Sequence, residues 1–340
     1  MSVQDYLQEL LRTASHYELT EGEKNLIHTN GIEAFVLARL LSKKFRKWKS
    51  DSACIDRTRQ AIAQRVARHE PIPVVYFQGG YKLWRLPSSP EADWAEFFNI
   101  AYVLQYVAPI AAAYEKGVDV VYYMHTLLME KHDNLTTEEI TAYGRSFQKL
   151  IDAFATYLPS NITLRILRDA DIYDRKSYFE SLEVGRKIAE RTFSSWPEEK
   201  VHNYTKMAKL NIKWKGKEDW SVLSEKDKDA KIRLALLYEE AAISSLPKVM
   251  EVVKSPANVL VFTKPTLSMI GIGSTYTSVA KHWVGFGVLE KDGERYYPRI
   301  LSPSQYDKAK VMDTESVSVL GFIPLRHCQE ILLFSQRLQF

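Results

Sequence analysis

The residues best suited to chemistry directly follow the apolar run at 72–77. Gly79 and Gly80 let the backbone bend sharply and bring its amides close to a ligand. Lys82 and Arg85 add positive charge beside these amides, and Ser88 adds a hydroxyl. The combination predicts a site for an anion such as a phosphate. A glycine-rich turn with solvent-facing cations explains the same residues, and the sequence alone leaves both interpretations open.

Asp93 lies at the start of the next expected helix. A helix amino terminus attracts anions, and a carboxylate there either caps the helix or contacts a ligand. The spacing of this segment matches neither the GxxxxGK[ST] phosphate loop nor the GxGxxG dinucleotide pattern. The sequence therefore predicts no standard nucleotide motif in this loop.

A second group of polar residues follows the apolar run at 118–124. We expect the segment that contains them, 124–134, to be a polar loop. His125 comes first, followed by Glu130, His132 and Asp133. The spacing matches no helix-based metal-ligand pattern, so we predict no metal. His125 is the better candidate for a proton-transfer role, because an unperturbed imidazole titrates near neutral pH.

Two later segments are less specific. Ser274 lies in GIGSTYTS (271–278), which fits either a phosphate-holding loop or a tight turn. Arg299 lies near the end of an expected strand. We include both as substrate-binding candidates. The alternating charges at 168–175 are typical of a solvated loop or helix start.

The elements that must position these residues alternate along the chain. Apolar runs at 72–77, 118–124 and 161–167 predict strands, and the stretches 93–115 and 136–158 between them predict helices. Such alternation indicates parallel βαβ units with helices on both faces. Sites in α/β folds are usually built at the carboxyl ends of the strands, where the candidate loops lie.

The predicted fold is therefore α/β, with a Rossmann-like parallel core between two other parts. Residues 1–70 form a helical extension, and residues 71–340 form the α/β domain. Its carboxyl-terminal segment, about 257–340, is β-rich, with Asp292-Gly293 as a hairpin turn. The basic cluster at 42–49 is read as a solvated helix end rather than a nucleic-acid patch.

Composition narrows the class of protein. The net charge is +4, 46% of the 340 residues are hydrophobic, and Cys54 and Cys328 are the two cysteines. These values exclude a disordered chain and a disulfide scaffold. The acidic amphipathic start is unlike a secretory signal, and no apolar run reaches the length of a membrane helix. We expect a cytoplasmic protein with no nucleic-acid or membrane partner, and the sequence leaves a homo-oligomer open.

The stretch 74–152 resembles the isonitrile synthase family, also called the pyoverdine/dityrosine biosynthesis family. That family places a lysine in the loop after a strand, as Lys82 is here, and opens a long helix with a Pro-Asp segment, matched by PEAD at 90–93. The segment RILSP at 299–303 resembles the family's Arg-Leu-Ser-Ile-His-Pro segment. The family's Ser-Asp-Gly after the second strand is replaced here by Met124-His125-Thr126.

The resemblance implies a Rossmann-like fold and a biosynthetic enzyme of secondary metabolism. The implied reaction condenses the amine of an amino acid with the ketone of ribulose 5-phosphate and ends in an isonitrile. On this hypothesis Lys82 and Arg85 hold the phosphate, Asp93 orients the amine and His125 moves protons. No cofactor is required.

Two alternatives remain open at this point. One is a transferase that uses a nucleotide or nucleotide-sugar, with GIGSTYTS as a second phosphate contact. The other is a non-catalytic protein that binds a small molecule or acts as a scaffold on the same fold.

Overall fold

The computed structural model describes most of the chain. The described residues are 1–79, 91–133, 135–202, 205, 220–243, 248, 251, 260–262, 270–278, 280–309 and 311–339.

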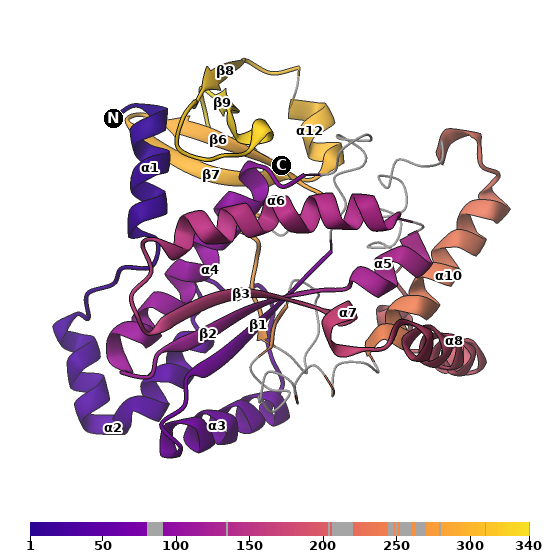
Figure 1. Cartoon of the computed structure of the whole chain (residues 1–340), viewed down its shortest axis with the longest axis horizontal. Helices are drawn as coiled ribbons and strands as arrows, with labels where there is room; N and C mark the ends of the chain where they lie inside the picture. The colour runs from indigo at the N-terminus through magenta and orange to yellow at the C-terminus, as the bar shows by residue number, and fades with distance from the viewer. Residues whose placement is uncertain are drawn as a thin grey trace.

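A parallel sheet forms the centre of the molecule (Figure 1). Its strand order is β3-β2-β1-β4-β5, and every described pairing is parallel. The strands are β1 (Ile72–Gln78), β2 (Val118–Met124), β3 (Ile162–Arg168), β4 (Leu260–Phe262) and β5 (Ile270–Gly271). Strand β1 is buried along its whole length, as its continuous apolar sequence predicts for a strand covered on both faces. The predicted α/β fold class is confirmed.

Helices α4 (Trp94–Ala113) and α6 (Thr137–Ala155) cover one face of this sheet, and α3 (Ser52–Ala67) lies below it in Figure 1. The start of α6 is fixed by a capping box, in which Thr136 and Glu139 hydrogen-bond each other's backbone amides. Helix α4 is apolar around most of its circumference. It is buried accordingly, because other elements pack on the side away from the sheet.

A second sheet packs against α4. It has the order β7-β6-β9-β8 and consists of β6 (Phe286–Asp292), β7 (Arg295–Leu301), β8 (Thr314–Ser318) and β9 (Glu330–Phe334). The expected hairpin turn joins β6 to β7, with Gly293 at φ +60°. Gly287 allows the close approach, because a Cβ there would lie 2.3 Å from the Ala95 amide nitrogen. Helix α12 (Pro303–Ala309) follows β7.

The amino-terminal helices α1 (Val3–Thr13) and α2 (Glu21–Leu40) join the main hydrophobic core. The basic segment after α2 does not extend the helix as expected, but lies along the edge strand β5. The Lys47 amide donates to the Gly271 carbonyl at 2.8 Å, and Arg46 forms a β-bridge with Ile272. Burial lowers the pKa of the Lys47 ammonium, which donates to the Tyr276 carbonyl at 2.6 Å. The segment thus covers backbone groups that an edge strand would otherwise expose.

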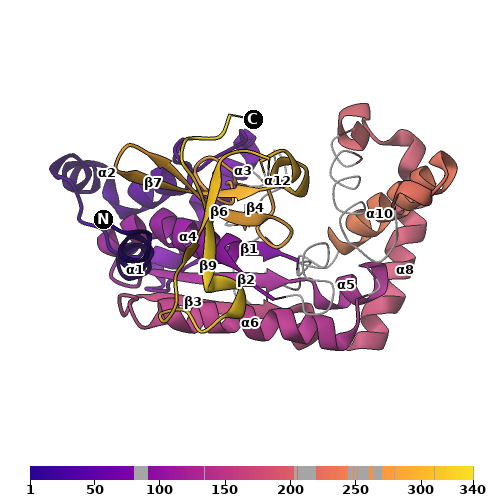
Figure 2. The ribbon, with the colours of Figure 1, turned by 90° about the horizontal axis from the view of Figure 1, so that it is seen from above.

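A small helical lobe lies beyond the carboxyl ends of the strands, at the right of Figure 2. It contains α5 (Thr126–Asp133), α7 (Asp169–Ile172), α8 (Arg175–Thr192) and α10 (Glu225–Ile243). Helix α5 stands where the sequence suggested a polar loop. Its Leu127 and Leu128 pack with Tyr178 and Leu182 of α8, which explains why this segment is ordered as a helix.

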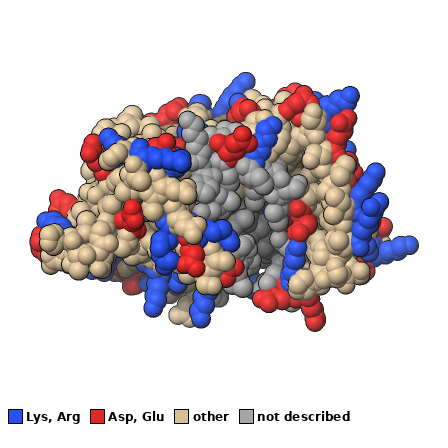
Figure 3. All heavy atoms as spheres, turned by 90° about the horizontal axis from the view of Figure 1, so that it is seen from below, with Lys and Arg blue, Asp and Glu red and all other residues tan. Residues whose placement is uncertain are grey.

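Short 3₁₀ turns lie at Phe193–Ser195, Trp220–Val222 and Arg326–Cys328. Over the face shown in Figure 3, Lys and Arg side chains are mixed with Asp and Glu side chains rather than gathered in one patch. Within the described residues, no helix is both long and apolar enough to cross a membrane.

Candidate functional site

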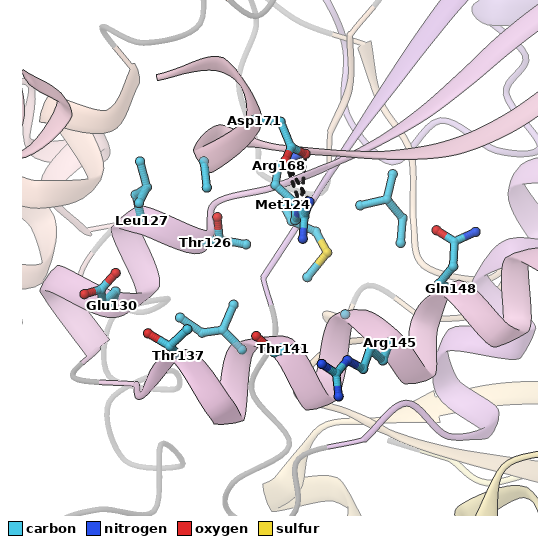
Figure 4. Close-up of a pocket in the computed structure, with 14 residues that line it drawn as sticks. Met124, Thr126, Leu127, Glu130, Thr137, Thr141, Arg145, Gln148, Arg168 and Asp171 are labelled. Carbon is cyan, nitrogen blue, oxygen red and sulfur yellow. Dashed lines mark hydrogen bonds and ion pairs between the residues drawn. The ribbon is translucent and has the colours of Figure 1, made fainter. Parts of the chain in front are cut away.

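An open pocket of about 550 Å³ lies at the carboxyl ends of β2 and β3 (Figure 4). Helices α5, α6 and α7 form its walls. Its lining residues are Met124, Thr126, Leu127, Glu130, Thr137, Ile140, Thr141, Gly144, Arg145, Gln148, Ile166, Arg168, Ala170 and Asp171. We call this the edge pocket. Its volume lies within the range of small-molecule sites.

The edge pocket exists because α6 fills the space over the sheet with only one of its faces. Tyr143 and Phe147 are fully buried on that face, whereas Gly144 lies on the pocket side. A Cβ added at Gly144 would meet no atom within 4 Å. Apolar side chains of Met124, Ile140 and Ile166 also line the cavity.

Polar groups surround this apolar surface. Arg168 is held by Asp171 through a 2.7 Å contact from Nη2 to Oδ1, and these hydrogen bonds raise the pKa of the Arg168 guanidinium. Glu130 pairs with Arg175, so its charge is also compensated. The hydroxyl of Thr141 and the amide of Gln148 complete a mixed lining (Figure 4). A small molecule with both a polar and an apolar part suits such a cavity.

A buried carboxylate supports one wall of the edge pocket. Asp169 is 0% exposed and accepts hydrogen bonds from the Thr126 hydroxyl and from the amides of Leu127 and Ala170, both at 2.9 Å. It thereby caps the first turn of α5. Burial raises the pKa of Asp169 to about 6, although these donors act in the opposite direction. The alternating charges at 168–175 suggested a solvated loop or a helix start. Helix α7 does start at Asp169, but the Asp169 carboxylate is buried rather than solvated.

A second group of functional candidates is buried above the end of β1. Gln78, the last residue of the strand, is 1% exposed, and its Oε1 lies 3.1 Å from Nε2 of His282. The Gln78 amide nitrogen is buried and has no hydrogen-bond partner within the described structure. It can therefore donate to a ligand oxygen. Neither side chain was a sequence candidate, because 204 residues separate them.

A separate hydrogen-bond network lies beside this pair, toward α4, where the Tyr76 ring lies 5.6 Å from the His282 ring. Asn99 donates to the Tyr76 hydroxyl at 3.2 Å and to the Ser274 carbonyl at 3.0 Å. The Tyr122 hydroxyl donates to Asn99 Oδ1 at 3.1 Å. Burial raises the pKa of Tyr76 and of Tyr122, so both phenols remain neutral. The network fixes the strand ends of β1 and β2 relative to the 273–278 turn.

Asp93 and Glu96 are both buried at the start of α4. Asp93 Oδ1 accepts from the Ala95 amide at 2.7 Å, and the Asp93 amide donates to Glu96 Oε2 at 2.9 Å. Glu96 Oε1 accepts from the Tyr143 hydroxyl at 3.0 Å, and burial, followed by the Glu96 charge, raises the pKa of Tyr143 well above its ordinary value. Asp93 therefore has the helix-capping contact that the sequence left open as an alternative.

His125 lies on the other face of the sheet from Asp93. Its ring stacks on Phe77 at 5.5 Å and meets the Tyr123 ring edge-on at 4.7 Å. Phe77 and Tyr123 alternate with Tyr76 and Tyr122, whose side chains point toward α4. The structure therefore does not bring Asp93 and His125 together on one face of the sheet.

The remaining sequence candidates have varied surroundings. Gly79 is buried directly after β1, and Gly80, Lys82, Arg85 and Ser88 lie outside the described residues.

Ser274 is buried in a turn that its own backbone closes, because its amide donates to the Ser278 carbonyl at 2.9 Å. Arg299 pairs at 2.7 Å with the buried Glu290 and also donates to the Leu338 carbonyl. These contacts favour the tight-turn interpretation of 271–278. They also give Arg299 a role in holding the end of the chain. Among the described residues, no group of His, Cys, Asp and Glu is arranged to hold a metal.

The fold and the polar groups at its sheet edge define a Rossmann-like α/β protein with a second sheet packed on one helix. A solved structure with this architecture is that of the PvcA protein from Pseudomonas aeruginosa. It matches with a TM-score of 0.66 and 15% sequence identity, covering 89% of this chain and 99% of PvcA. No family model matches the sequence, and no curated protein matches it significantly.

Proposed function

We propose that this chain is a biosynthetic enzyme resembling the isonitrile synthases. It condenses the amine of an amino acid with the ketone of a phosphorylated sugar such as ribulose 5-phosphate. PvcA is a biosynthetic enzyme of that family, and its fold extends over nearly all of this chain. The observation that carries the proposal is an open pocket at the carboxyl edge of the parallel sheet in this shared fold.

The condensation is an addition followed by loss of water. The amine nitrogen attacks the ketone carbon, and a proton moves from nitrogen to the former carbonyl oxygen. That oxygen then leaves as water when the imine forms. The reaction needs a bound anion, a positioned amine and a group that moves protons.

We assign these tasks to residues around the sheet edge. Lys82 and Arg85 hold the phosphate, as the resemblance implies. The edge pocket receives the amino acid, with its apolar lining against the side chain and Arg168 near the carboxylate. The buried Gln78 amide nitrogen is a donor for the ketone oxygen. Asp93 and His125 remain the sequence-based proposals for orienting the amine and moving protons.

The two other hypotheses have less support. The transferase hypothesis used GIGSTYTS as a phosphate contact, but Ser278 and Thr275 there hydrogen-bond within the turn, at 3.1 Å between the Ser278 amide and the Thr275 hydroxyl. A non-catalytic protein on the same fold predicts ligand binding without turnover. The experiment below separates these hypotheses.

The test incubates the protein with single amino acids and ribulose 5-phosphate. Borohydride is added to trap the imine as an amine, and products are detected by mass spectrometry. We expect a trapped adduct for at least one amino acid. A nucleotide that raises the melting temperature without any adduct would favour the transferase, and binding without adduct would favour the non-catalytic protein.

Gly144→Phe provides the structural control. It places a ring in the edge pocket where a Cβ meets no atom within 4 Å. We expect at least a hundredfold loss of adduct formation with an unchanged melting temperature. Gly22→Phe on α2 also has open space around its Cβ but lies far from the pocket in sequence and fold, so it should retain full activity. Equal activity of Gly144→Phe and Gly22→Phe would show that the edge pocket is not the site.

A further inference from the structure

A second cavity, of about 220 Å³, lies away from the strand ends, where α1 meets α4 and β7. Tyr6 and Leu10 of α1 form one wall, and Tyr102 of α4, Tyr276 and Tyr296 contribute others. We call it the tyrosine cavity. It uses none of the residues assigned to the proposed reaction.

The rings are arranged as two pairs. Tyr6 and Tyr296 have centroids 5.3 Å apart and are tilted by 44°. Tyr102 and Tyr276 are 5.0 Å apart and nearly perpendicular, at 85°. Aromatic groups favour tilted and edge-to-face contacts at such distances. A further planar ring between the pairs can make the same contacts with both.

The lining contains hydrogen-bonding groups but no charged side chain. The hydroxyls of Tyr102 and Tyr296 donate to the carbonyls of Phe45 and Met1. The hydroxyls of Tyr6 and Tyr276 make no hydrogen bond within the described structure. Burial raises the pKa of Tyr276 to about 12 and that of Tyr6 further, so both phenols stay neutral.

The side chains in and around the cavity favour a ligand without a net charge. An ion buried in the cavity would lose its hydration, and the lining contains no charged side chain that could form a direct ion pair with it. A cation would meet Lys44, whose ammonium lies 4.7 Å from the centre of the Tyr276 ring. A neutral ligand avoids both penalties.

The volume of the tyrosine cavity limits the size of the ligand that it can hold. A protein cavity of about 150 Å³ lined by apolar residues holds benzene. The tyrosine cavity is larger by about the volume of one or two substituents, yet smaller than sites for multi-ring ligands.

We propose that the tyrosine cavity is a binding site for a neutral, single-ring or indole-sized aromatic molecule that carries one hydrogen-bonding group. The ligand lies between the Tyr6–Tyr296 and Tyr102–Tyr276 pairs and bonds the Tyr6 or Tyr276 hydroxyl. It thereby fastens α1 to the rest of the molecule. This site is independent of the proposed condensation.

The first experiment titrates the wild-type protein with phenol, toluene, cyclohexanol and benzoate by isothermal calorimetry. We expect phenol to bind most tightly, toluene more weakly, and cyclohexanol and benzoate not at all. Phenol should also slow amide hydrogen exchange in residues 3–13. Absence of phenol binding at millimolar concentration, or equal affinity for benzoate, would overturn the proposal.

Two kinds of variant locate the ligand. Ala101→Leu fills the cavity from α4, where Ala101 is buried at 2% exposure, and should abolish binding of phenol and toluene. If this variant does not fold, Leu10→Phe fills the same space from α1. Unchanged phenol binding in a folded filling variant would show that the ligand lies elsewhere.

The double variant Tyr6→Phe/Tyr276→Phe removes both hydroxyls but keeps the rings. It should weaken phenol binding roughly fivefold to tenfold and leave toluene unchanged. Tyr157→Phe, a partly exposed tyrosine outside the cavity, is the matched control and should change neither. If the double variant binds phenol as the wild type does, the hydrogen bond assigned here is wrong.

Discussion

The edge pocket and the tyrosine cavity are built from different parts of the same fold, and this explains their different chemistry. The edge pocket lies where parallel strands end, so turns and helix starts supply charged and hydroxyl-bearing residues such as Arg168 and Thr126. The tyrosine cavity lies between the packed faces of α1, α4 and β7, where amphipathic side chains predominate and no charged side chain belongs to the lining, although the Lys44 ammonium lies close to the Tyr276 ring. One region is equipped for polar substrates, and the other for a neutral ring.

The largest expected difference between the two regions is in their response to pH. Asp169 supports the edge pocket, and its pKa is raised from 3.8 to about 6 by burial. A carboxyl with a raised pKa in the folded state stabilises the protein below its unfolded pKa, and this contribution is lost as the pH rises through 6. From the size of the shift, the loss is roughly 3 kcal/mol between pH 3 and pH 7.

Asp169→Asn isolates this effect, because the amide keeps an acceptor for the Leu127 amide but does not titrate. The free energy of unfolding is measured by urea denaturation for both proteins from pH 3 to pH 7. The difference, wild type minus variant, should fall by roughly 3 kcal/mol over this range. A difference that stays constant or rises with pH would contradict the raised pKa. Phenol affinity should not vary over the same range, because the tyrosine cavity has no group that titrates there.

A smaller effect is expected for the loop after β1, which the resemblance assigns to phosphate binding. Lys82→Ala should remove one charge-assisted contact, worth about 1.5–3 kcal/mol, or roughly tenfold to a hundredfold in affinity for ribulose 5-phosphate. Calorimetric titration and thermal unfolding are measured together. Phenol affinity should not change. If sugar-phosphate affinity is also unchanged, or if the variant unfolds instead, this loop is structural.

The smallest effect concerns the wall of the edge pocket. Gly144→Ala should raise the free energy of unfolding by about 0.5–1 kcal/mol, because alanine restricts the unfolded chain and the helical Cβ meets no atom. Substrate binding should be retained, in contrast to Gly144→Phe. A destabilised Gly144→Ala variant would mean that α6 needs a glycine here for packing that the wall of an open pocket would not impose.

Local patterns in the sequence determined much of the fold. The apolar run at 72–77 became β1, the Thr136–Glu139 spacing became the start of α6, and Asp292-Gly293 became the β6–β7 turn. Each depends on residues within a few positions of one another, so steric preference and local hydrogen bonding suffice to specify it. The alternation of strands and helices also predicted that the strands are parallel and that a site lies at their carboxyl ends, where the edge pocket is found.

Only the tertiary structure decided which side chains meet. The charged neighbours of Asp169 in the sequence suggest a solvated side chain. In the structure the Asp169 carboxylate is buried and accepts a hydrogen bond from the first turn of α5. Gln78 and His282 come together only when the turn after β5 folds back over β1. The tyrosine cavity requires α1 to dock beside β7, nearly three hundred residues away. Such contacts depend on how completed elements pack, and no short-range pattern in the sequence encodes that arrangement.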